Sequence, residues 1–347
     1  MTKLLICLCS MALAGMAQGV APVDRAITLL TPDGVSLAGT LTVPLQKVPA
    51  AAVVLAPGAG ATDRDDTIFK HKPFAVLAGR LAAEGVAVLR LDSRGVGGSG
   101  GKYADATGET LANDLLAAVV WLKHQPEIDP RRVGLIGHSQ GGVVVARAAA
   151  TSADVAFLVL LAAPGLPDTD LVALRIAAAG RARGASAEDI AAVQKGFRSA
   201  RARQAAGEDD AALRAALAAA RMMLPPGVDP PAPALEAAIT QQIEAAKSPN
   251  GAYFLTHDPR ESYRRLRCPV LALSGSLDQN VPANENLAAI RAAIQEDQAV
   301  NTTTQVLDGL NHFFQTARTG SFTEMAQIEE AIAPKALDAI SSWVRRR

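Results

Sequence analysis

The stretch GLIGHSQGGVVVA, residues 134–146, decides the fold. Apolar residues precede and follow Ser139, and a glycine stands two positions away on each side. A sharp turn from a strand into a helix needs small residues at those two positions, because larger side chains would clash as the turn closes. The stretch therefore predicts a turn that exposes the Ser139 hydroxyl as a candidate nucleophile. A phosphate-binding helix start is the alternative, but the lysine and glycine spacing of a phosphate loop are missing.

Strands and helices alternate on both sides of this turn. Two strands around the sequence PDG read as a hairpin, and the later strands are short and apolar. Apolar strands that alternate with helices indicate a mostly parallel sheet with both faces covered, whose reactive loops lie at the carboxyl ends of the strands. The predicted strands are 26–31, 35–44, 51–56, 86–92, 132–137, 155–162, 268–276 and 302–309. The predicted helices are 74–85, 109–125, 140–150, 283–296 and 324–345.

The pattern changes in residues 166–262. This segment is rich in alanine, arginine and glutamate, carries no strand signal, and is interrupted by PPGVDPPAPA at 225–234, which cannot be helical. We interpret 166–262 as a helical cap inserted into a core formed by 20–165 and 263–347. A helical arm for dimerisation is the alternative.

The first 19 residues have the pattern of a signal peptide. Lys3 precedes the apolar run LLICLCSMALAGMA, and AQG at 17–19 is a cleavage signal of small residues. A transmembrane anchor is the competing interpretation, but the run is shorter than the roughly 20 residues that span a bilayer. We predict cleavage near Gly19–Val20, no stable membrane anchor afterwards, and a periplasmic or secreted protein.

Charge and cysteine content exclude several classes of function. The formal net charge is +0, which argues against a nucleic-acid partner. Cys7 and Cys9 leave with the signal peptide, so only Cys268 remains and no internal disulfide can form. Cysteines and histidines with zinc spacing are absent from the sequence. We therefore expect a small-molecule substrate, no metal and no cofactor.

A serine nucleophile needs a base, and the sequence offers five histidines. After a nucleophile on a strand–turn–helix, the acid and then the histidine follow in chain order. His312, in the loop after the last predicted strand, fits this order. His257 precedes the strand that should carry the acid, and His138 adjoins Ser139 and is expected to shape the turn. Local structural roles are expected for the two histidines before the nucleophile, His71 and His124.

The acid that orients the base is predicted as Asp278. It follows the apolar run VLALSGSL, just beyond a strand end, and leads into the sequence QNVP. A carboxylate there can hold the imidazole in the required tautomer and stabilise its charge. Asp308 is the rival, but it lies four residues before His312 in a loop where aspartate commonly forms turns.

An oxyanion hole requires two backbone N–H donors. The first is predicted at Gln140, the residue after the nucleophile. The second is expected from PGAG at 57–60, at Ala59 with Gly60 as the next choice, because small residues let the backbone approach a substrate closely. An ordinary glycine turn is the alternative for this segment.

Five segments in the right order resemble the α/β-hydrolases, and more narrowly the bacterial serine esterases of the dienelactone-hydrolase-like and S9-peptidase-like branch. They are PGAGATDRD (57–65), HKPFAVLAGRLAAEGVAVLRLDSRGVGGSGG (71–101), GLIGHSQGG (134–142), CPVLALSGSLDQNVP (268–282) and LDGLNHFFQTARTG (307–320). The resemblance implies an α/β-hydrolase fold, with a mostly parallel sheet of about eight strands flanked by helices. It also implies hydrolysis of short-chain carboxylic esters by Ser139, Asp278 and His312 through an acyl-enzyme.

Three further features bear on this resemblance. Asp63, Arg64 and Asp65 match a charged signature of these esterases, and we interpret them as a salt-bridged loop that shapes the oxyanion segment. The loop at 92–100 recurs throughout the fold and is expected to be structural. Gln140 stands where these relatives often carry glutamate, a change that leaves its backbone N–H unaffected.

Other functions on the same triad stay open. A serine peptidase or aminoacyl amidase and an acyl thioesterase would use the same three residues. An inactive binding protein on a hydrolase fold is the alternative outside enzymes. Such proteins typically lose a member of the triad, and this chain keeps all three.

Overall fold

The computed structural model describes residues 22–45, 48–208, 210–221, 232–297 and 300–347. Its centre is an eight-stranded sheet of order β1-β2-β4-β3-β5-β6-β7-β8, antiparallel from β1 to β4 and parallel from β4 to β8. The strands are β1 (Val23–Leu30), β2 (Ser36–Val43), β3 (Ala50–Ala56), β4 (Val86–Leu91), β5 (Ile128–His138), β6 (Leu158–Leu161), β7 (Val270–Gly275) and β8 (Thr302–Leu307). The mostly parallel α/β sheet predicted from the sequence is confirmed.

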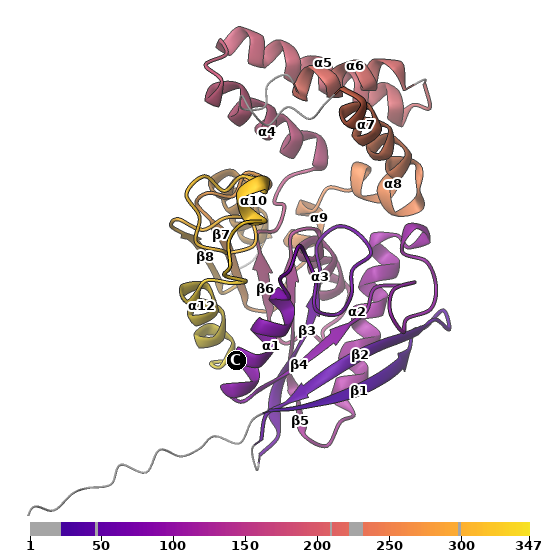
Figure 1. The fold of residues 1–347 in the computed structure, drawn as a ribbon. Coiled ribbons are helices and arrows are strands. Elements are labelled where there is room, and N and C mark those ends of the chain that lie inside the picture. The colour runs from indigo at the N-terminus through magenta and orange to yellow at the C-terminus, as the bar shows by residue number, and fades with distance from the viewer. Residues whose placement is uncertain (1–21, 46–47, 209, 222–231, 298–299) are drawn as a thin grey trace, which may run out of the picture.

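Helices cover both faces of the sheet (Figure 1). Residues of α1 (Pro73–Ala83) and α12 (Pro334–Val344) pack on one face. Residues of α2 (Gly108–Lys123), α3 (Gln140–Thr151) and α10 (Ala283–Asp297) pack on the other. Strand β3 is buried along its whole length, and its neighbours Val53 and Val54 belong to the two different apolar clusters. This two-sided burial explains why the inner strands are continuous apolar runs.

The segment between β6 and β7 is helical in every named element. Figure 1 shows α4 to α8 gathered beyond one end of the sheet, where β6 leads into α4. Isoleucine, leucine and phenylalanine side chains of this group form an apolar cluster apart from the two clusters on the sheet. The elements are α4 (Asp168–Ala182), α5 (Ala187–Ala205), α6 (Ala211–Arg221), α7 (Ala232–Lys247), α8 (Pro249–Thr256) and α9 (Arg260–Arg264).

The last predicted helix, 324–345, is wrong as a single element. The structure has a short helix, α11 (Phe322–Met325), and a separate α12 that begins at Pro334. Proline lacks an N–H and disfavours helical backbone at the preceding residue, and Ala333 is extended with φ −62° and ψ 140°. The proline therefore starts a helix at its first position, where the missing N–H needs no partner.

Two sequence predictions lie partly or wholly outside the described residues. The signal peptide at 1–19 lies wholly outside them, and so does most of the proline-rich stretch at 225–234. The prediction that 225–234 is not helical is wrong for its last three residues, because α7 begins at Ala232 and a proline is tolerated in a first helical turn. In the described part of the chain, no helix is both long enough and apolar enough to cross a bilayer. Within those same residues, no cluster of three or more histidine, cysteine or acidic side chains is arranged to hold a metal ion.

Candidate active site

Ser139 stands at a strained turn between β5 and α3. Its backbone has φ 53° and ψ −123°, in the left-handed region that side chains other than glycine rarely adopt. The Ser139 N–H donates to the carbonyl of Leu161 on the neighbouring strand β6, at 2.8 Å. Strain of this kind persists only where surrounding packing enforces it, and it clusters at functional sites.

The glycines on either side are required by the closeness of the backbone. A Cβ at Gly137 would lie 2.4 Å from the carbonyl oxygen of Gly141. A Cβ at Gly141 would lie 2.3 Å from the carbonyl oxygens of Ala56 and Pro57, at the end of β3. Since atoms cannot approach so closely, only glycine lets α3 start against the loop that follows β3.

The structure brings the three predicted catalytic residues together. The Ser139 hydroxyl lies 3.1 Å from Nε2 of His312, and Nδ1 of His312 lies 2.8 Å from Oδ2 of Asp278. The side chains of His312 and Asp278 are 5% and 0% exposed, so water does not compete for the bond between them. The other carboxylate oxygen, Oδ1, accepts the N–H groups of Asn280 and Val281, each at 2.8 Å. These two bonds fix the orientation of the acid.

The rival acid takes no part in this arrangement. Asp308 accepts a hydrogen bond from the Ser276 hydroxyl at 3.1 Å in an exposed turn. Two of the remaining histidines bond to backbone carbonyls, His71 to Ile328 and His124 to Val120. His124 has the local structural role expected from the sequence, whereas the buried His71 contacts a residue far away in the chain, so the expectation of a local role is wrong for His71.

His138 supports the loop that carries the base. Its Nε2 lies 3.0 Å from the backbone carbonyl oxygen of His312, and its ring packs 4.9 Å from the His312 ring. Burial lowers the pKa of His138 to about 3, so the ring is neutral at physiological pH and can donate from Nε2. The neighbour of the nucleophile thus holds the His312 backbone in place.

The predicted oxyanion segment lies against the nucleophile. A Cβ at Gly58 would be in van der Waals contact with the Cβ of Ser139, at 3.4 Å. Ala59 and Gln140 line the same cavity as Ser139, as the predicted pair of donors requires. Gly60, the second choice of donor, already donates its N–H to the hydroxyl of Tyr103 at 3.3 Å. Since the Gly60 N–H is already engaged, Ala59 stays the predicted donor of this loop.

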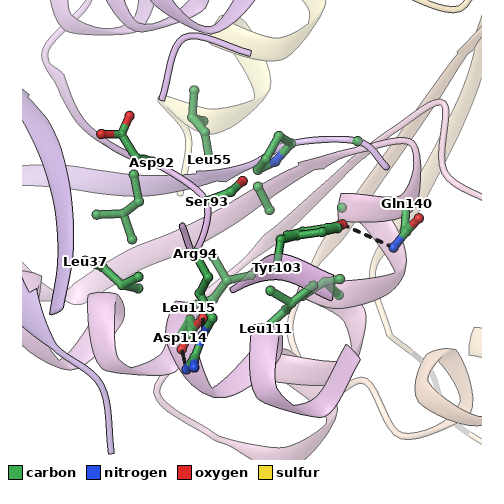
Figure 2. Close-up of a pocket in the computed structure, with 16 residues that line it drawn as sticks. Leu37, Leu55, Asp92, Ser93, Arg94, Tyr103, Leu111, Asp114, Leu115 and Gln140 are labelled. Carbon is green, nitrogen blue, oxygen red and sulfur yellow. Dashed lines mark hydrogen bonds and ion pairs between the residues drawn. The ribbon is translucent and has the colours of Figure 1, made fainter. Parts of the chain in front are cut away.

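Tyr103 links the two segments of the predicted oxyanion hole. It belongs to a short 3-10 helix, η1 (Tyr103–Asp105), and its hydroxyl accepts from Gly60 N–H and, at 3.5 Å, from the side-chain amide of Gln140. Figure 2 shows the phenol ring directed at Gln140 across a pocket with leucine walls. Nothing in the local sequence distinguishes Tyr103, because the residues it joins are far away in the chain.

The charged segment after the oxyanion loop is salt-bridged, as expected. Arg64 donates from Nε and Nη2 to the two carboxylate oxygens of Asp92, at 3.0 and 2.7 Å. Asp65 forms an ion pair with the buried Arg90 on β4. Asp63 accepts hydrogen bonds from the backbone N–H groups of Asp65 and Thr67. These contacts tie the loop after β3 to β4, which supports the structural interpretation.

The loop at 92–100 is also structural. Arg94 is buried and donates to Asp114 on α2 at 2.6 and 2.7 Å, and to Asp33 in the β1–β2 turn at 2.8 and 2.9 Å. A guanidinium that bonds two carboxylates in this way fixes three segments at once.

The cavity at Ser139 has a volume of about 230 Å³. Its walls come from α3 and from two helices of the segment between β6 and β7, with Val143 on α3, Leu171 on α4 and Phe254 on α8. Asp168, Arg175 and His257 are polar residues that also line it. Neither Asp168 nor Arg175 is among the site residues predicted from the sequence.

Asp66 carries a buried carboxyl beside the base. Burial, and then repulsion from Asp63, raises its pKa from 3.8 to about 6. The ring of His138 faces it, with Nδ1 at 3.8 Å from Oδ2, and His312 is close enough to lower the Asp66 pKa electrostatically. The ionised form of Asp66 is therefore held at an energetic cost at neutral pH.

We expect the stability of the Asp66→Asn variant, relative to that of the wild type, to increase as the pH rises from 4 to 7. The folded carboxyl binds a proton below about 6 and the unfolded one below 3.8, so the wild type loses stability between these values. Between these two pH values, the unfolding free energy of the variant should rise by about 3 kcal/mol relative to that of the wild type. Asparagine also tolerates the φ of 52° at this position. Urea unfolding of both proteins at five pH values tests this, and a difference independent of pH would contradict it.

Comparisons with known proteins agree with this geometry. The alpha/beta hydrolase family model matches residues 53–321. An uncharacterized protein of Mycobacterium tuberculosis is 34% identical over 128 residues, which are 37% of this chain and 42% of that protein. Esterase EstD of Thermotoga maritima is 33% identical over 132 residues, 38% of this chain and 31% of the esterase. These matches span less than half the length of either relative.

A likeness of fold extends over nearly the whole chain. The solved structure of the Pyrococcus furiosus esterase Pf2001 covers 94% of this chain and 91% of its own, with a TM-score of 0.57 and 16% identity. The interval matched by the family model contains the strained turn, the acid loop and the histidine loop. The chain therefore belongs to the alpha/beta hydrolase family.

Proposed function

We propose that this protein is an exported serine esterase that hydrolyses short-chain carboxylic esters. The observation that carries the proposal is the continuous chain of contacts from the Ser139 hydroxyl, which lines a cavity, through His312 to Asp278. The names of EstD and Pf2001, both esterases, favour an ester over other acyl compounds.

Acylation follows from the positions of these atoms. His312 Nε2 takes the hydroxyl proton as Ser139 Oγ attacks the ester carbonyl, and the π electrons of the carbonyl move to its oxygen. The N–H groups of Gln140 and Ala59 donate to this oxyanion. Asp278 accepts from Nδ1–H and stabilises the positive imidazolium without taking its proton.

The intermediate then collapses in two stages. The carbonyl re-forms, the ester C–O bond breaks, and the departing alcohol oxygen takes the proton from His312 Nε2. The acyl group stays on Ser139. Water attacks it with the same base and the same oxyanion donors, which releases the carboxylic acid and restores the serine hydroxyl.

Cavity size favours a small acyl group. The volume of about 230 Å³ is below the range of roughly 300–1,000 Å³ that is common for sites of drug-sized ligands. Because α4 and α8 line the cavity together with α3, the cap limits its length. An acyl chain of a few carbons fits such a space better than a long lipid chain.

The direct test is a series of p-nitrophenyl esters from acetate to palmitate, with p-nitroanilides and thioesters of the same acyl groups. We expect the highest kcat/KM on esters of two to four carbons, and one fluorophosphonate label on Ser139 by mass spectrometry. Faster turnover of the anilide or the thioester would assign the site to an amidase or a thioesterase. A folded protein that turns over none of these compounds and takes no label would refute the proposal.

The Tyr103→Phe variant should lower kcat about tenfold with little change in KM. Loss of the hydroxyl frees Gly60 and the Gln140 side chain, so the loop with the oxyanion donors is held less firmly. The effect should be smaller than the 10²–10³-fold that removal of a donor costs, since both predicted donors remain. Steady-state kinetics on the best ester measures it. A rise in KM at constant kcat would instead indicate a role in substrate binding.

Export is proposed on the sequence of the first 19 residues alone. Expression of the full sequence in a bacterium with a periplasm should give a soluble periplasmic protein that begins near Val20. Intact-mass measurement of the periplasmic fraction tests this. An uncleaved protein in the membrane fraction would support the anchor instead.

A further inference from the structure

Arg175 stands in the cavity without a part in the triad chemistry. It extends from α4, the first helix of the cap, and lines the same cavity as Ser139. Its Nε donates to the backbone carbonyl of Asn280, in the loop that begins with Asp278. The head group is thereby held beside the acid loop, within the substrate cavity.

The terminal nitrogens of Arg175 have no hydrogen-bond partner among the residues that the structure describes. Within the described ranges, no carboxylate lies within 4.0 Å of this guanidinium either. Asp168, the acidic residue of the cavity, instead has Arg201 at 4.0 Å. Arg175 and Arg201 therefore both lie near Asp168, and neither makes a close ion pair with it.

Arg175 is half-buried, and its terminal nitrogens are open to the cavity. Desolvation lowers the pKa of Arg175, and Asp168 and Asp278 offset this effect only as charges at a distance. A partly desolvated cation with unpaired N–H groups gains stability when an anion in the cavity binds it. The bond from Nε to Asn280 already attaches α4 to the acid loop. The two terminal nitrogens are not needed for that attachment.

The geometry suits one class of anion. A guanidinium presents parallel N–H groups that match the two oxygens of a carboxylate. His257, at the end of α8, also lines the cavity. Burial lowers the pKa of His257, so its ring is favoured in the neutral form and adds no charge to the cavity.

We propose that the natural substrate is an anionic ester, and that Arg175 binds a carboxylate lying a few bonds from the scissile carbonyl. This inference rests on the proposed esterase function and narrows its substrate class. Phe254, Leu171 and Val143 then surround the short apolar stretch between the ester and the charge.

Two pairs of esters test the proposal, each matched in size and differing in charge. Mono-p-nitrophenyl glutarate is compared with p-nitrophenyl valerate, which places the charge on the acyl side. The second pair, 4-acetoxybenzoate and its methyl ester, places it on the alcohol side. We expect the wild type to prefer the charged member of at least one pair by about tenfold or more in kcat/KM, the usual gain from a hydrogen-bonded ion pair.

The Arg175→Gln variant should reduce that preference to about one. Arg175→Lys, which keeps the charge but not the paired N–H groups, should restore part of it. Arg181→Gln is the matched control, because Arg181 lies on the same helix, is exposed and does not line the cavity. An equal loss on charged and neutral esters in Arg175→Gln, or no preference in the wild type for either pair, would overturn the proposal.

A binding measurement separates failure of this inference from failure of the esterase function. Monomethyl glutarate is titrated calorimetrically into Ser139→Ala protein and into the Ser139→Ala/Arg175→Gln double variant. We expect at least about tenfold weaker binding in the double variant. If wild-type protein hydrolyses no ester, the esterase function fails while this titration still reports on the carboxylate site. Equal binding by the two proteins refutes the site itself.

Discussion

The Ser139→Ala protein should fold normally and lose about 10⁴-fold or more of the wild-type kcat on its best ester. Only the hydroxyl is removed, and with it the atom that His312 activates at 3.1 Å. The substrate cavity and the predicted oxyanion donors stay, so KM should change little. Steady-state kinetics together with circular dichroism measures both parts of the expectation.

A second substitution at the same position separates chemistry from strain. Ser139→Gly should be as inactive as Ser139→Ala, yet more stable than it by about 1 kcal/mol, because glycine adopts φ 53° without strain. Urea unfolding compares the two variants. Substantial activity in either variant would show that Ser139 is not the nucleophile, and equal stabilities would show that the turn holds little strain.

The Gly141→Ala variant should lose about 3 kcal/mol of unfolding free energy. The added Cβ would lie 2.3 Å from the carbonyl oxygens of Ala56 and Pro57, so the end of β3 or the start of α3 must move. Because the loop with Ala59 follows directly, the predicted oxyanion donors move as well. A displacement near 1 Å is enough to reduce kcat about 10²-fold.

The control for this substitution is Gly79→Ala on α1. Its Cβ would meet no atom within 4 Å, and the helix gains from alanine, so the unfolding free energy should rise by about 0.5–1 kcal/mol. Thermal and urea unfolding of both variants give the comparison. If Gly141→Ala is as stable and as active as Gly79→Ala, close packing does not explain the glycine at 141.

The residues brought together at Ser139 are the ones whose positions follow from local rules. The turn is specified by glycine spacing, and His312 and Asp278 follow from chain order once the strands are placed. Parallel strands end at one edge of the sheet, so residues that follow β5, β7 and β8 meet there. The apolar runs predict where each strand begins and ends to within a few residues, because burial on both faces of the sheet is also a local property of the sequence.

The supporting residues could not be predicted because they act across long sequence separations. Tyr103 reaches Gly60 and Gln140 from a loop after β4, and Asp66 reaches His138 through a turn at positive φ. Arg175 is one of many arginines in an alanine-rich segment, and only the packing of α4 against the acid loop distinguishes it. The break between α11 and α12 could have been predicted, because Pro334 by itself indicates the start of a new helix.

The helices between β6 and β7 have their own apolar cluster, in which Phe197, Leu213 and Ile243 are buried against one another. The nucleophile turn depends instead on β3, β5 and β6. Substitutions inside this cluster therefore act first on the helices that line the cavity, and they reach the acid loop through the contact between Arg175 and Asn280. Substrate range can diverge in this architecture by changes in one compact group of helices, while the hydrolytic chemistry is inherited intact.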